Sequence, residues 1–306
     1  MLVAVAAASF QPQTVVTVDP THRLVEGVAT DGHTIWVSSI LDRTILACRK
    51  ACRPLAVLPP GLHPFAIAWD NNRKRLWAAA DCPPGVRGIK ACERGALIAL
   101  DKRGRVVTRV APGVGTFHPG DVSASNGQVF VSDSQNGMVF RLTPNGRGLM
   151  AVVLPGVGKS AQGTALSEDG KRLLVADYSQ GIGAVDLATG TRTLLPRQDG
   201  KPLRGIDGLV RCGSTYYGIS NGDVPGILVW IIETGRGITF GQPLPIILNQ
   251  PLGDLPLQDP TQIAYDGKRL LIVADSGWAT LDKGGFVRTE GAPIIAIPLS
   301  KDCKPT

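Results

Sequence analysis

The sequence predicts an all-β fold, a six-bladed β-propeller with four-stranded blades. A segment with one pattern, an apolar alternation followed by a turn and a second β-run, occurs six times along the 306 residues. Apolar residues alternate with a period of two, and runs with helical spacing are nearly absent. The 37 glycines and 23 prolines supply the turns that many short strands need. β-Repeats of roughly 40 to 50 residues are typical of propeller blades.

The six repeats predict the blades in chain order. Each begins with an inner strand, passes through a tight turn to a second strand, and leads through a third and a fourth strand to the next repeat. Aligned on the inner strand, each repeat contributes one side chain to the mouth of the central channel. The repeats are VEGVATDGHTIWVSS from Val25, HPFAIAWDNNRKRLWAAAD from His63, HPGDVSASNGQVFVSDS from His118, AQGTALSEDGKRLLVAD from Ala161, GIDGLVRCGSTYYGISN from Gly205 and PTQIAYDGKRLLIVAD from Pro260, with mouth positions at Glu26, Phe65, Gly120, Gln162, Asp207 and Thr261.

The two ends of the chain are expected to close the ring. The last repeat has room for three strands, the third being APIIAIPL from Ala292, and the segment from Thr14 to Val18 is expected to supply the fourth. Residues 13–306 then form one domain. Residues 1–12, which begin MLVAVAAASFQ, resemble the end of a secretory signal, so we expect a periplasmic or secreted protein.

The charge of the chain argues against nucleic-acid binding. The formal net charge is +7, but the basic residues are scattered through turns, and no dense run or RNA-binding motif is present. No stretch after the N-terminus is long and apolar enough to span a bilayer. We therefore expect a monomer whose partner is a small-molecule substrate.

Six cysteines predict three disulfides. Cys48 and Cys52 flank a hairpin turn. Cys82 and Cys92 bracket a loop, and Cys212 and Cys303 remain to join the fifth blade to the C-terminal tail. An even count without a CxxC pair or a Cys/His cluster favours disulfides over a metal site, although 15 pairings are formally possible.

The mouth positions include two carboxylates and one carboxamide, Glu26, Asp207 and Gln162. Buried like charges repel each other unless they are protonated or bind a cation. Oxygen ligands favour a hard divalent cation, Ca²⁺ before Mg²⁺, with Mn²⁺ or Zn²⁺ as alternatives. The other interpretation is that these carboxylates accept hydrogen bonds from neighbouring loops.

These motifs resemble the gluconolactonase family that includes regucalcin, over roughly Arg23 to Leu299. The resemblance implies a six-bladed propeller with one catalytic divalent metal. It places a ligand at Glu26 in VEGVATDG, and a ligand and proposed general base at Asp207 in GIDGLV. It places a third ligand at Gln162 in QGTALSEDG and a substrate contact at His118 in HPGDV, where the family has asparagine at both positions.

Further substrate-binding candidates surround the mouth. They are Asp121, which neighbours a mouth position, together with Asn221, Phe65 and Arg204. Aspartates at the ends of the second strands, at positions 81, 133, 177 and 275, are interpreted as caps of loop amides, although Asp177 and Asn221 flank blades with proposed ligands. Two long loops, from Asp81 to Arg94 and from Asp275 to Gly291, are expected either to wall the pocket or to be ordinary surface loops.

Together these residues predict a metal-dependent hydrolase of a lactone or related ester. Glu26, Gln162 and Asp207 would hold the cation, Asp207 would act as base, and His118 would orient substrate or relay a proton. The alternative is a non-catalytic propeller that binds a small molecule or a protein at the same mouth. Similarity to paraoxonase-like or strictosidine-synthase-like propellers is a third interpretation, the former supported by His118 and His63.

Overall fold

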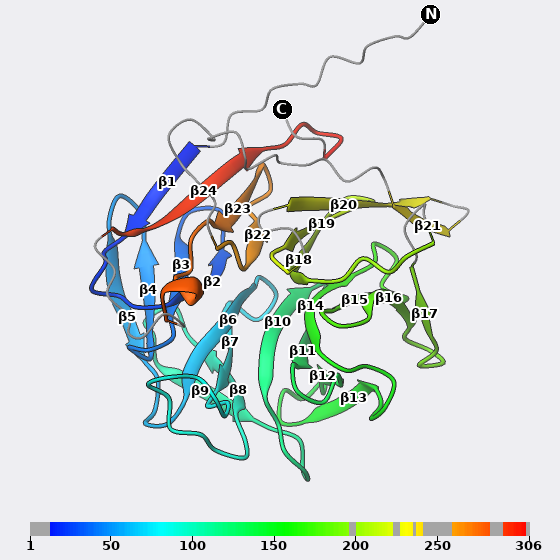
Figure 1. Ribbon diagram of the computed structural model, residues 1–306, viewed down its shortest axis with the longest axis horizontal. Coiled ribbons are helices and arrows are strands. Elements are labelled where there is room, and N and C mark those ends of the chain that lie inside the picture. Colours follow the sequence, from blue (N-terminus) through cyan, green and yellow to red (C-terminus); the bar gives the residue numbers. More distant parts are fainter. Residues whose placement is uncertain are drawn as a thin grey trace, which may run out of the picture.

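The chain folds as a β-propeller in a computed structural model that describes residues 13–195, 200–222, 227–234, 237–240, 259–281 and 290–303. The described strands form six antiparallel four-stranded sheets arranged radially around a central axis (Figure 1). The predicted all-β propeller and its four-stranded blades are confirmed. We number the sheets one to six in the chain order of their inner strands.

The strands follow the chain from the axis outward in each sheet. The first three sheets are β2 (Val25–Thr30), β3 (Ile35–Ser39), β4 (Thr44–Cys48) and β5 (Cys52–Val57); β6 (His63–Asp70), β7 (Arg75–Asp81), β8 (Ala96–Leu100) and β9 (Val106–Val110); and β10 (Pro119–Ser125), β11 (Gln128–Asp133), β12 (Val139–Leu142) and β13 (Leu149–Val153). The fourth and fifth are β14 (Ala161–Leu166), β15 (Arg172–Asp177), β16 (Gly181–Asp186) and β17 (Arg192–Leu194); and β18 (Ile206–Cys212), β19 (Thr215–Ser220), β20 (Ile227–Thr234) and β21 (Gly237–Phe240).

The sixth sheet is assembled from both ends of the described chain. Its strands are β22 (Ile263–Tyr265), β23 (Arg269–Val273), β24 (Ala292–Pro298) and, on the outside, β1 (Gln13–Val18). The β1–β24 pairing is antiparallel, with Thr17 opposite Pro293. The predicted closure of the ring by an N-terminal strand is therefore confirmed, and residues 1–12 lie outside the described residues.

The hydrophobic core is divided among the spaces between neighbouring sheets. One cluster joins the first and second sheets through Trp36, Ile45 and Ile98, and an equivalent cluster fills each following space. The sixth space, between the last and first sheets, contains Val18 of β1 together with residues of β2 and β23. Because each sheet packs on two neighbours, the ring is the unit that buries the apolar faces.

A β-bulge occurs near the start of five of the six inner strands. The register in the first sheet shifts by one residue between Val25 and Val28, and the second to fifth sheets show the same shift. A bulge bends its strand and changes the direction of the side chain that it carries. Glu26 and Asp207 lie inside such bulges, which explains why the mouth residues follow one pattern in the sequence.

Glycine follows the mouth residue where neighbouring inner strands come closest. A Cβ on Gly27 would lie 2.6 Å from the carbonyl oxygen of Phe65 in the next sheet. A Cβ on Gly163 would lie 2.4 Å from the amide nitrogen of Leu209. Contacts this short exclude a side chain, so the glycines of VEGV and AQGT are required by backbone contact around the axis.

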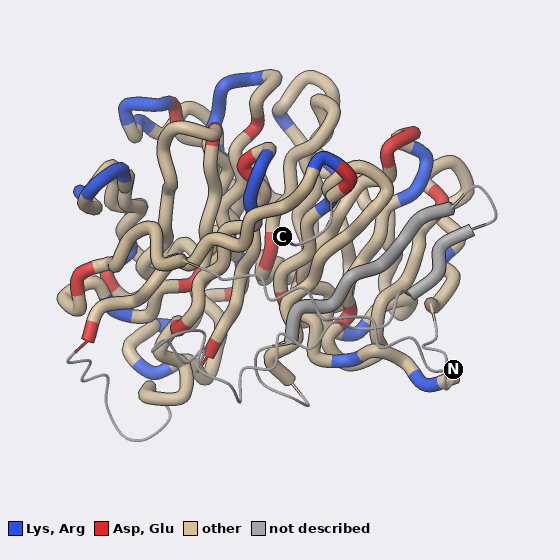
Figure 2. Tube along the Cα trace, turned by 90° about the horizontal axis from the view of Figure 1, so that it is seen from above, with Lys and Arg blue, Asp and Glu red and all other residues tan. Residues whose placement is uncertain are grey.

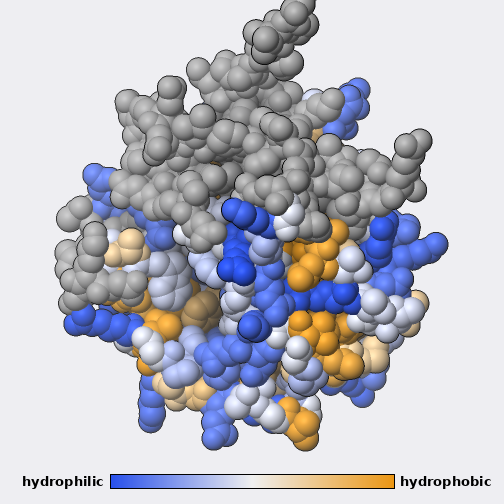
Figure 3. All heavy atoms as spheres, turned by 45° about the vertical axis from the view of Figure 1, so that its right-hand side comes forward, coloured by the Kyte–Doolittle hydropathy of each residue, from blue (hydrophilic) through white to orange (hydrophobic). Residues whose placement is uncertain are grey.

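Outside the strands, the structure describes one short helix, α1 (Trp278–Leu281). In the described part of the chain, no helix is long and apolar enough to cross a membrane. On the side turned forward in Figure 3, polar residues separate small hydrophobic areas. Lys and Arg segments lie at several turns along the upper edge of Figure 2.

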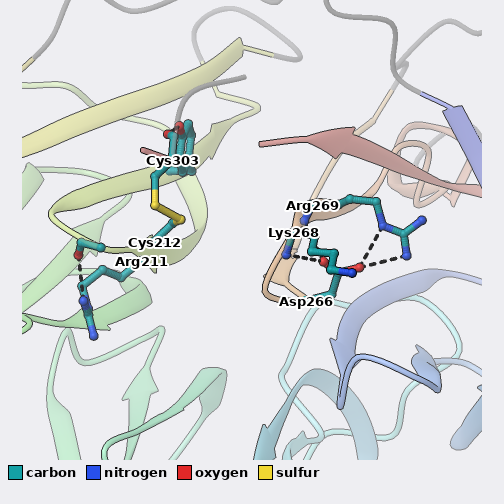
Figure 4. Close-up of a disulfide and its surroundings, with 8 residues drawn as sticks. Arg211, Cys212, Asp266, Lys268, Arg269 and Cys303 are labelled. Atoms are coloured by element: carbon teal, nitrogen blue, oxygen red, sulfur yellow. Dashed lines mark hydrogen bonds and ion pairs between the residues drawn. A yellow bond between two sulfur atoms is a disulfide. The ribbon is translucent and has the colours of Figure 1, made fainter. Parts of the chain in front are cut away.

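All three predicted disulfides are present. Cys48–Cys52 closes the β4–β5 turn, and Cys82–Cys92 closes the loop after β7. Cys212–Cys303 joins the end of β18 to the C-terminal segment (Figure 4). The hydroxyl of Tyr217 donates a hydrogen bond to the carbonyl of Cys303, so the tail is also tied to the core between the fifth and sixth sheets.

Removal of the long-range disulfide is expected to destabilise the protein more than removal of a local one. Cys212 and Cys303 are separated by 91 residues, and Cys48 and Cys52 by four. Loop-closure entropy predicts losses of about 4 and about 2 kcal/mol in the free energy of unfolding, respectively. Urea denaturation of the two double Cys→Ser variants measures both values, and an equal or reversed order would contradict the expectation.

Candidate active site

Glu26 and Asp207 lie at the mouth of the central channel, each held by a neutral donor. Oε2 of Glu26 accepts a 2.7 Å hydrogen bond from the indole Nε1 of Trp278, in α1. Oδ2 of Asp207 accepts a 2.9 Å bond from Nδ2 of Asn221. Neither carboxylate forms an ion pair with a cationic side chain in the described part of the chain.

Asn221 is itself fixed by two groups. Its Nδ2 also donates to the carbonyl of Pro260 at 2.9 Å, and its Oδ1 accepts from the hydroxyl of Tyr178 at 3.1 Å. The amide orientation is therefore defined, and its N–H group must point toward Asp207. The structure shows Asn221 bonded to Asp207, and its predicted contact with substrate stays a prediction.

Gln162 reaches toward the neighbouring third sheet. A Cβ on Gly120 would lie 2.9 Å from Oε1 of Gln162, so glycine at that mouth position leaves space for the longer side chain. Oε1 of Gln162 has no hydrogen-bond partner among the described residues. The mouth position without a side chain in the third sheet thus accommodates the carboxamide from the fourth.

Three carboxyl groups near the axis have raised pKa values. Burial is the largest cause in each case. The negative charge of Asp207 raises the pKa of Glu26 well above its usual range and contributes to the raised pKa of Asp121, about 8. The pKa of Asp207 itself is raised to about 6, although its bond from Asn221 opposes the rise. Without a counter-charge, burial therefore favours the neutral form of Glu26 and Asp121 at neutral pH, while Asp207 is largely ionised there.

The oxygens that remain free fit a hard cation. Oε1 of Glu26, Oδ1 of Asp207 and Oε1 of Gln162 are not used in hydrogen bonds within the described residues. A divalent cation would relieve the repulsion between the two carboxylates, and oxygen ligands suit Ca²⁺. Within the described ranges, no group of three His, Cys, Asp or Glu side chains is placed to hold a metal.

Two loops wall the mouth around Phe65. Its ring lies 6.4 Å from that of Trp278, centroid to centroid, and it packs with Val86 and Ile89 from the loop closed by Cys82–Cys92. The structure therefore supports the wall interpretation for the described parts of both long loops. Phe65 was predicted to bind substrate, but most of its environment is protein.

His118 is buried beside a carboxylate. It is 5% exposed, and its Nδ1 lies 3.2 Å from Oδ1 of Asp81. Burial raises the pKa of Asp81 to about 6, and the neighbouring His118 opposes this rise. In catalytic sites a carboxylate often orients an imidazole through such a contact. The catalytic role of His118 stays a prediction.

Two of the other second-strand aspartates, Asp133 and Asp177, mainly cap loops, as predicted. Oδ1 of Asp133 accepts from the amides of Gln135 and Asn136. Asp177 does the same for Ser179 and Gln180, and its Oδ2 accepts from Lys159. These bonds account for the carboxylates without a ligand.

Asp121 forms a crossbar with a residue that sequence reasoning missed, Gln262. Oδ1 of Asp121 accepts a 2.6 Å bond from Nε2 of Gln262, while Oε1 of Gln262 accepts from the amides of Val28 and Ile67 at 3.0 and 3.3 Å. Asp121 comes from the third sheet and Gln262 precedes β22 of the sixth, so the crossbar spans the channel. At the equivalent position the other sheets have Gly27, Ala66, Gly163 and Gly208.

The crossbar also forms one end of a cavity. A volume of about 260 Å³ opens toward the face opposite the mouth and is lined by Asp121 and Gln262 with Ser123, Thr164 and Tyr265. Asp121, a candidate for substrate binding, lines this cavity and bonds to Gln262, and its contact with a substrate stays a prediction. The crossbar is the boundary between the cavity and the mouth.

Sequence reasoning identified part of this site. It missed Trp278, the first residue of α1, and Tyr178, in the turn after β15, because neither lies in a recognisable motif. Gln262 could have been identified from the sequence. Four of the six residues that directly follow the mouth positions are glycine or alanine, and the two exceptions are Gln262 and Asp121. Arg204 is exposed, and the structure gives it no contact that would place it in the site.

Comparisons with known proteins bear on the fold. No protein-family model matches the sequence, and no curated protein matches it. Among solved structures, a gluconolactonase from Xanthomonas campestris is 19% identical, with a TM-score of 0.60 over 94% of this chain and 89% of that one. The calcium-binding protein regucalcin from Agrobacterium tumefaciens is 16% identical, with a TM-score of 0.60 over 94% and 93%. A PQQ-bound aldose sugar dehydrogenase from Streptomyces coelicolor is 15% identical, with a TM-score of 0.62 over 95% and 98%.

The likeness establishes a β-propeller. At these identities it carries no activity over to this chain, since similar propellers support different chemistry. The gluconolactonase and regucalcin likenesses agree with the family resemblance of the sequence motifs. The function must therefore be argued from the residues at the mouth.

The crossbar is expected to stabilise the ring. Gln262→Ala removes the acceptor of two buried amides, those of Val28 and Ile67, and should lower the free energy of unfolding by about 3 kcal/mol. Gln135→Ala, at an exposed position, serves as the matched control and should change it by less than about 0.5 kcal/mol. Chemical denaturation measures both, and similar values for the two variants would refute a structural role.

Stability of the metal-free protein is expected to fall as pH rises from about 5 to about 8. The pKa values of Asp121 and Asp207 are higher in the folded state than in the unfolded state. Between the two values, the folded state therefore holds protons that the unfolded state has released. This contribution is complete below the unfolded pKa and is lost as pH passes the folded value. Melting temperatures measured in chelator across this range test the trend, and Ca²⁺ should reduce the loss.

Asp121→Asn provides the specific check on this trend. The substitution retains a neutral polar side chain but removes a group whose pKa is about 8, so the melting temperature should depend less on pH. Asp302→Asn, at an exposed position, should leave the slope unchanged. A slope unaltered by Asp121→Asn would show that this carboxyl is not the source.

Proposed function

We propose that the protein is a metal-dependent hydrolase that opens a lactone or related ester at the mouth of the propeller. The observation that carries the proposal is the convergence of Glu26 and Asp207, each held by a neutral donor and each with one oxygen left free. A structural ion pair would instead be expected to pair a carboxylate with a cationic side chain. The cation proposed here is Ca²⁺, held by Glu26, Asp207 and Gln162.

The cation would supply Lewis-acid polarisation of the scissile carbonyl. Asp207 would accept a proton from the attacking water, because a carboxylate with a pKa of about 6 is both ionised and basic enough near neutral pH. Asn221 would hold that carboxylate in one orientation, and Trp278 would do the same for Glu26.

His118 would relay a proton to the leaving oxygen or orient the substrate. Its contact with Asp81 fixes the ring and favours a proton on Nδ1, which leaves Nε2 for the substrate. Where the resembling family has asparagine, this chain has an imidazole that can accept or donate a proton. The proposed reaction should accordingly show a dependence on pH that an amide at this position would not produce.

The proposed setting is the periplasm or the cell exterior. Three disulfides support an oxidising compartment, because disulfides are rare in reducing ones. The assignment rests on this chemistry and on the signal-like residues 1–12 of the sequence. Detection of the protein in culture fractions would test it.

Metal content is the first test of the active site. After dialysis against trace Ca²⁺, Mg²⁺, Mn²⁺ and Zn²⁺, elemental analysis should find about one ion per wild-type chain, as expected for one set of oxygen ligands. Asp207→Ala and Glu26→Ala should lose the ion. Glu168→Gln, which removes an exposed carboxylate, is the control and should retain it.

The same variants separate catalysis from binding. Asp207→Ala should lower kcat/KM for lactone hydrolysis by about 100-fold or more, as expected for loss of a general base and a ligand. Full activity in that variant would refute the mechanism. A bound ion without turnover on a broad panel of lactones and esters would identify the mouth as a binding site of a non-catalytic propeller.

His118→Asn tests the proton relay separately. The variant should keep its bound ion but lose activity, and its residual rate should vary less with pH than that of the wild type. His33→Asn, at an exposed position, controls for general effects of the exchange. Unchanged rate and pH profile in His118→Asn would exclude this residue from the reaction.

A further inference from the structure

A basic groove lies away from the mouth, between the first and second sheets. Its volume is about 900 Å³. It is lined by Arg49, Lys50, Arg53 and Lys102 around the apolar side chains of Trp36 and Leu55. Arg49 and Lys50 lie in the turn from β4 to β5, Arg53 lies at the start of β5, and Lys102 lies in the turn from β8 to β9, all at the end of the propeller opposite the mouth.

The charge in the groove is largely unbalanced. Arg49, Lys50 and Arg53 are exposed, and no carboxylate lies within ion-pair distance of them in the described part of the chain. Lys102 pairs with Asp31 at 2.9 Å. Cations gathered around one concavity repel each other and attract an anion, more strongly than the same charges spread over a convex surface.

The groove is also preorganised. The Cys48–Cys52 disulfide closes the turn that carries Arg49 and Lys50. The two cysteines are also opposite each other in the β4–β5 pairing, next to Arg53. A fixed turn loses less conformational entropy on binding than a flexible one. The floor is rigid as well, because Trp36 is 3% exposed and stacks on Trp69 at 4.9 Å.

We propose that this groove binds a small multivalent oxyanion, one that carries several phosphate or carboxylate groups. Two arginines offer planar forks that match both groups, and the lysines add point charges. The volume exceeds that of a single phosphate and falls in the range of small-molecule sites. The groove is independent of the mouth, and its ligand need not be the substrate of the proposed hydrolase.

Isothermal titration calorimetry with inorganic tripolyphosphate at low ionic strength tests the proposal. We expect saturable binding to one site that weakens as salt is added, because exposed charges are screened. A parallel titration with citrate distinguishes phosphate from carboxylate ligands. Tighter binding of tripolyphosphate would indicate a ligand with phosphate groups, and tighter binding of citrate would indicate a ligand with carboxylate groups. Absence of saturable binding with both anions would overturn the proposal.

Charge-matched variants locate the site. Arg49→Gln/Lys50→Gln/Arg53→Gln should weaken binding about tenfold or more, since each exposed pair contributes a few-fold. The control removes three exposed cations from other turns at the same end of the propeller: Arg147→Gln/Lys171→Gln/Lys268→Gln. An equal loss in the control would show attraction to the whole face and would refute a groove.

A further variant tests the disulfide-closed turn without changing charge. Cys48→Ser/Cys52→Ser keeps every cation and should weaken tripolyphosphate binding a few-fold, provided that its circular dichroism shows the folded sheets. Binding equal to that of the wild type would contradict preorganisation by the disulfide. Lactone hydrolysis measured on the triple variant separates this proposal from the proposed function, because the groove residues do not reach the mouth.

Discussion

The structure depends on direct backbone contact between neighbouring inner strands around the axis. Gly27 and Gly163 lie so close to the next strand that a single added carbon would collide with its backbone. The bulge that precedes each contact turns the mouth residue toward the axis. The same local geometry therefore closes the ring and directs the functional side chains, which explains why Glu26, Gln162 and Asp207 are each followed directly by glycine.

The convergence of carboxyl groups at the axis also has an electrostatic cost. Burial and the charges of neighbouring carboxylates raise the pKa values of Glu26, Asp121 and Asp207. Among the described residues, the neutral groups of Trp278 and Asn221 are the side chains that bind the two mouth carboxylates. A core optimised for stability would not collect such groups. Their retention supports a site that is completed by a cation, with part of the ring's stability given up for chemistry.

Local periodicity was sufficient to predict the strands, the ring closure and the disulfide pairing, because each is expressed by spacing along the chain. The contacts of the site are less accessible to this reasoning. Trp278 meets Glu26 across 252 residues, and Gln262 meets Asp121 across 141. These contacts depend on where the loops return to the axis, and the alternation of apolar and polar residues along the strands does not specify that position. Phe65 was assigned correctly to the mouth, but the loops that cover it could not be placed from their composition.

The closing strand has a consequence for biosynthesis. β1 precedes every other described strand in the chain, yet it cannot pair until its partner β24, the last of them, has been synthesised. Until then the apolar residues of β1 lack their sheet, and the sixth interface cannot form. Folding of the complete ring must therefore wait for the whole chain, which is the arrangement expected to fold slowly because its decisive contacts are the most distant in sequence. A chain that crosses a membrane before folding would reach the far side with this final step still ahead of it.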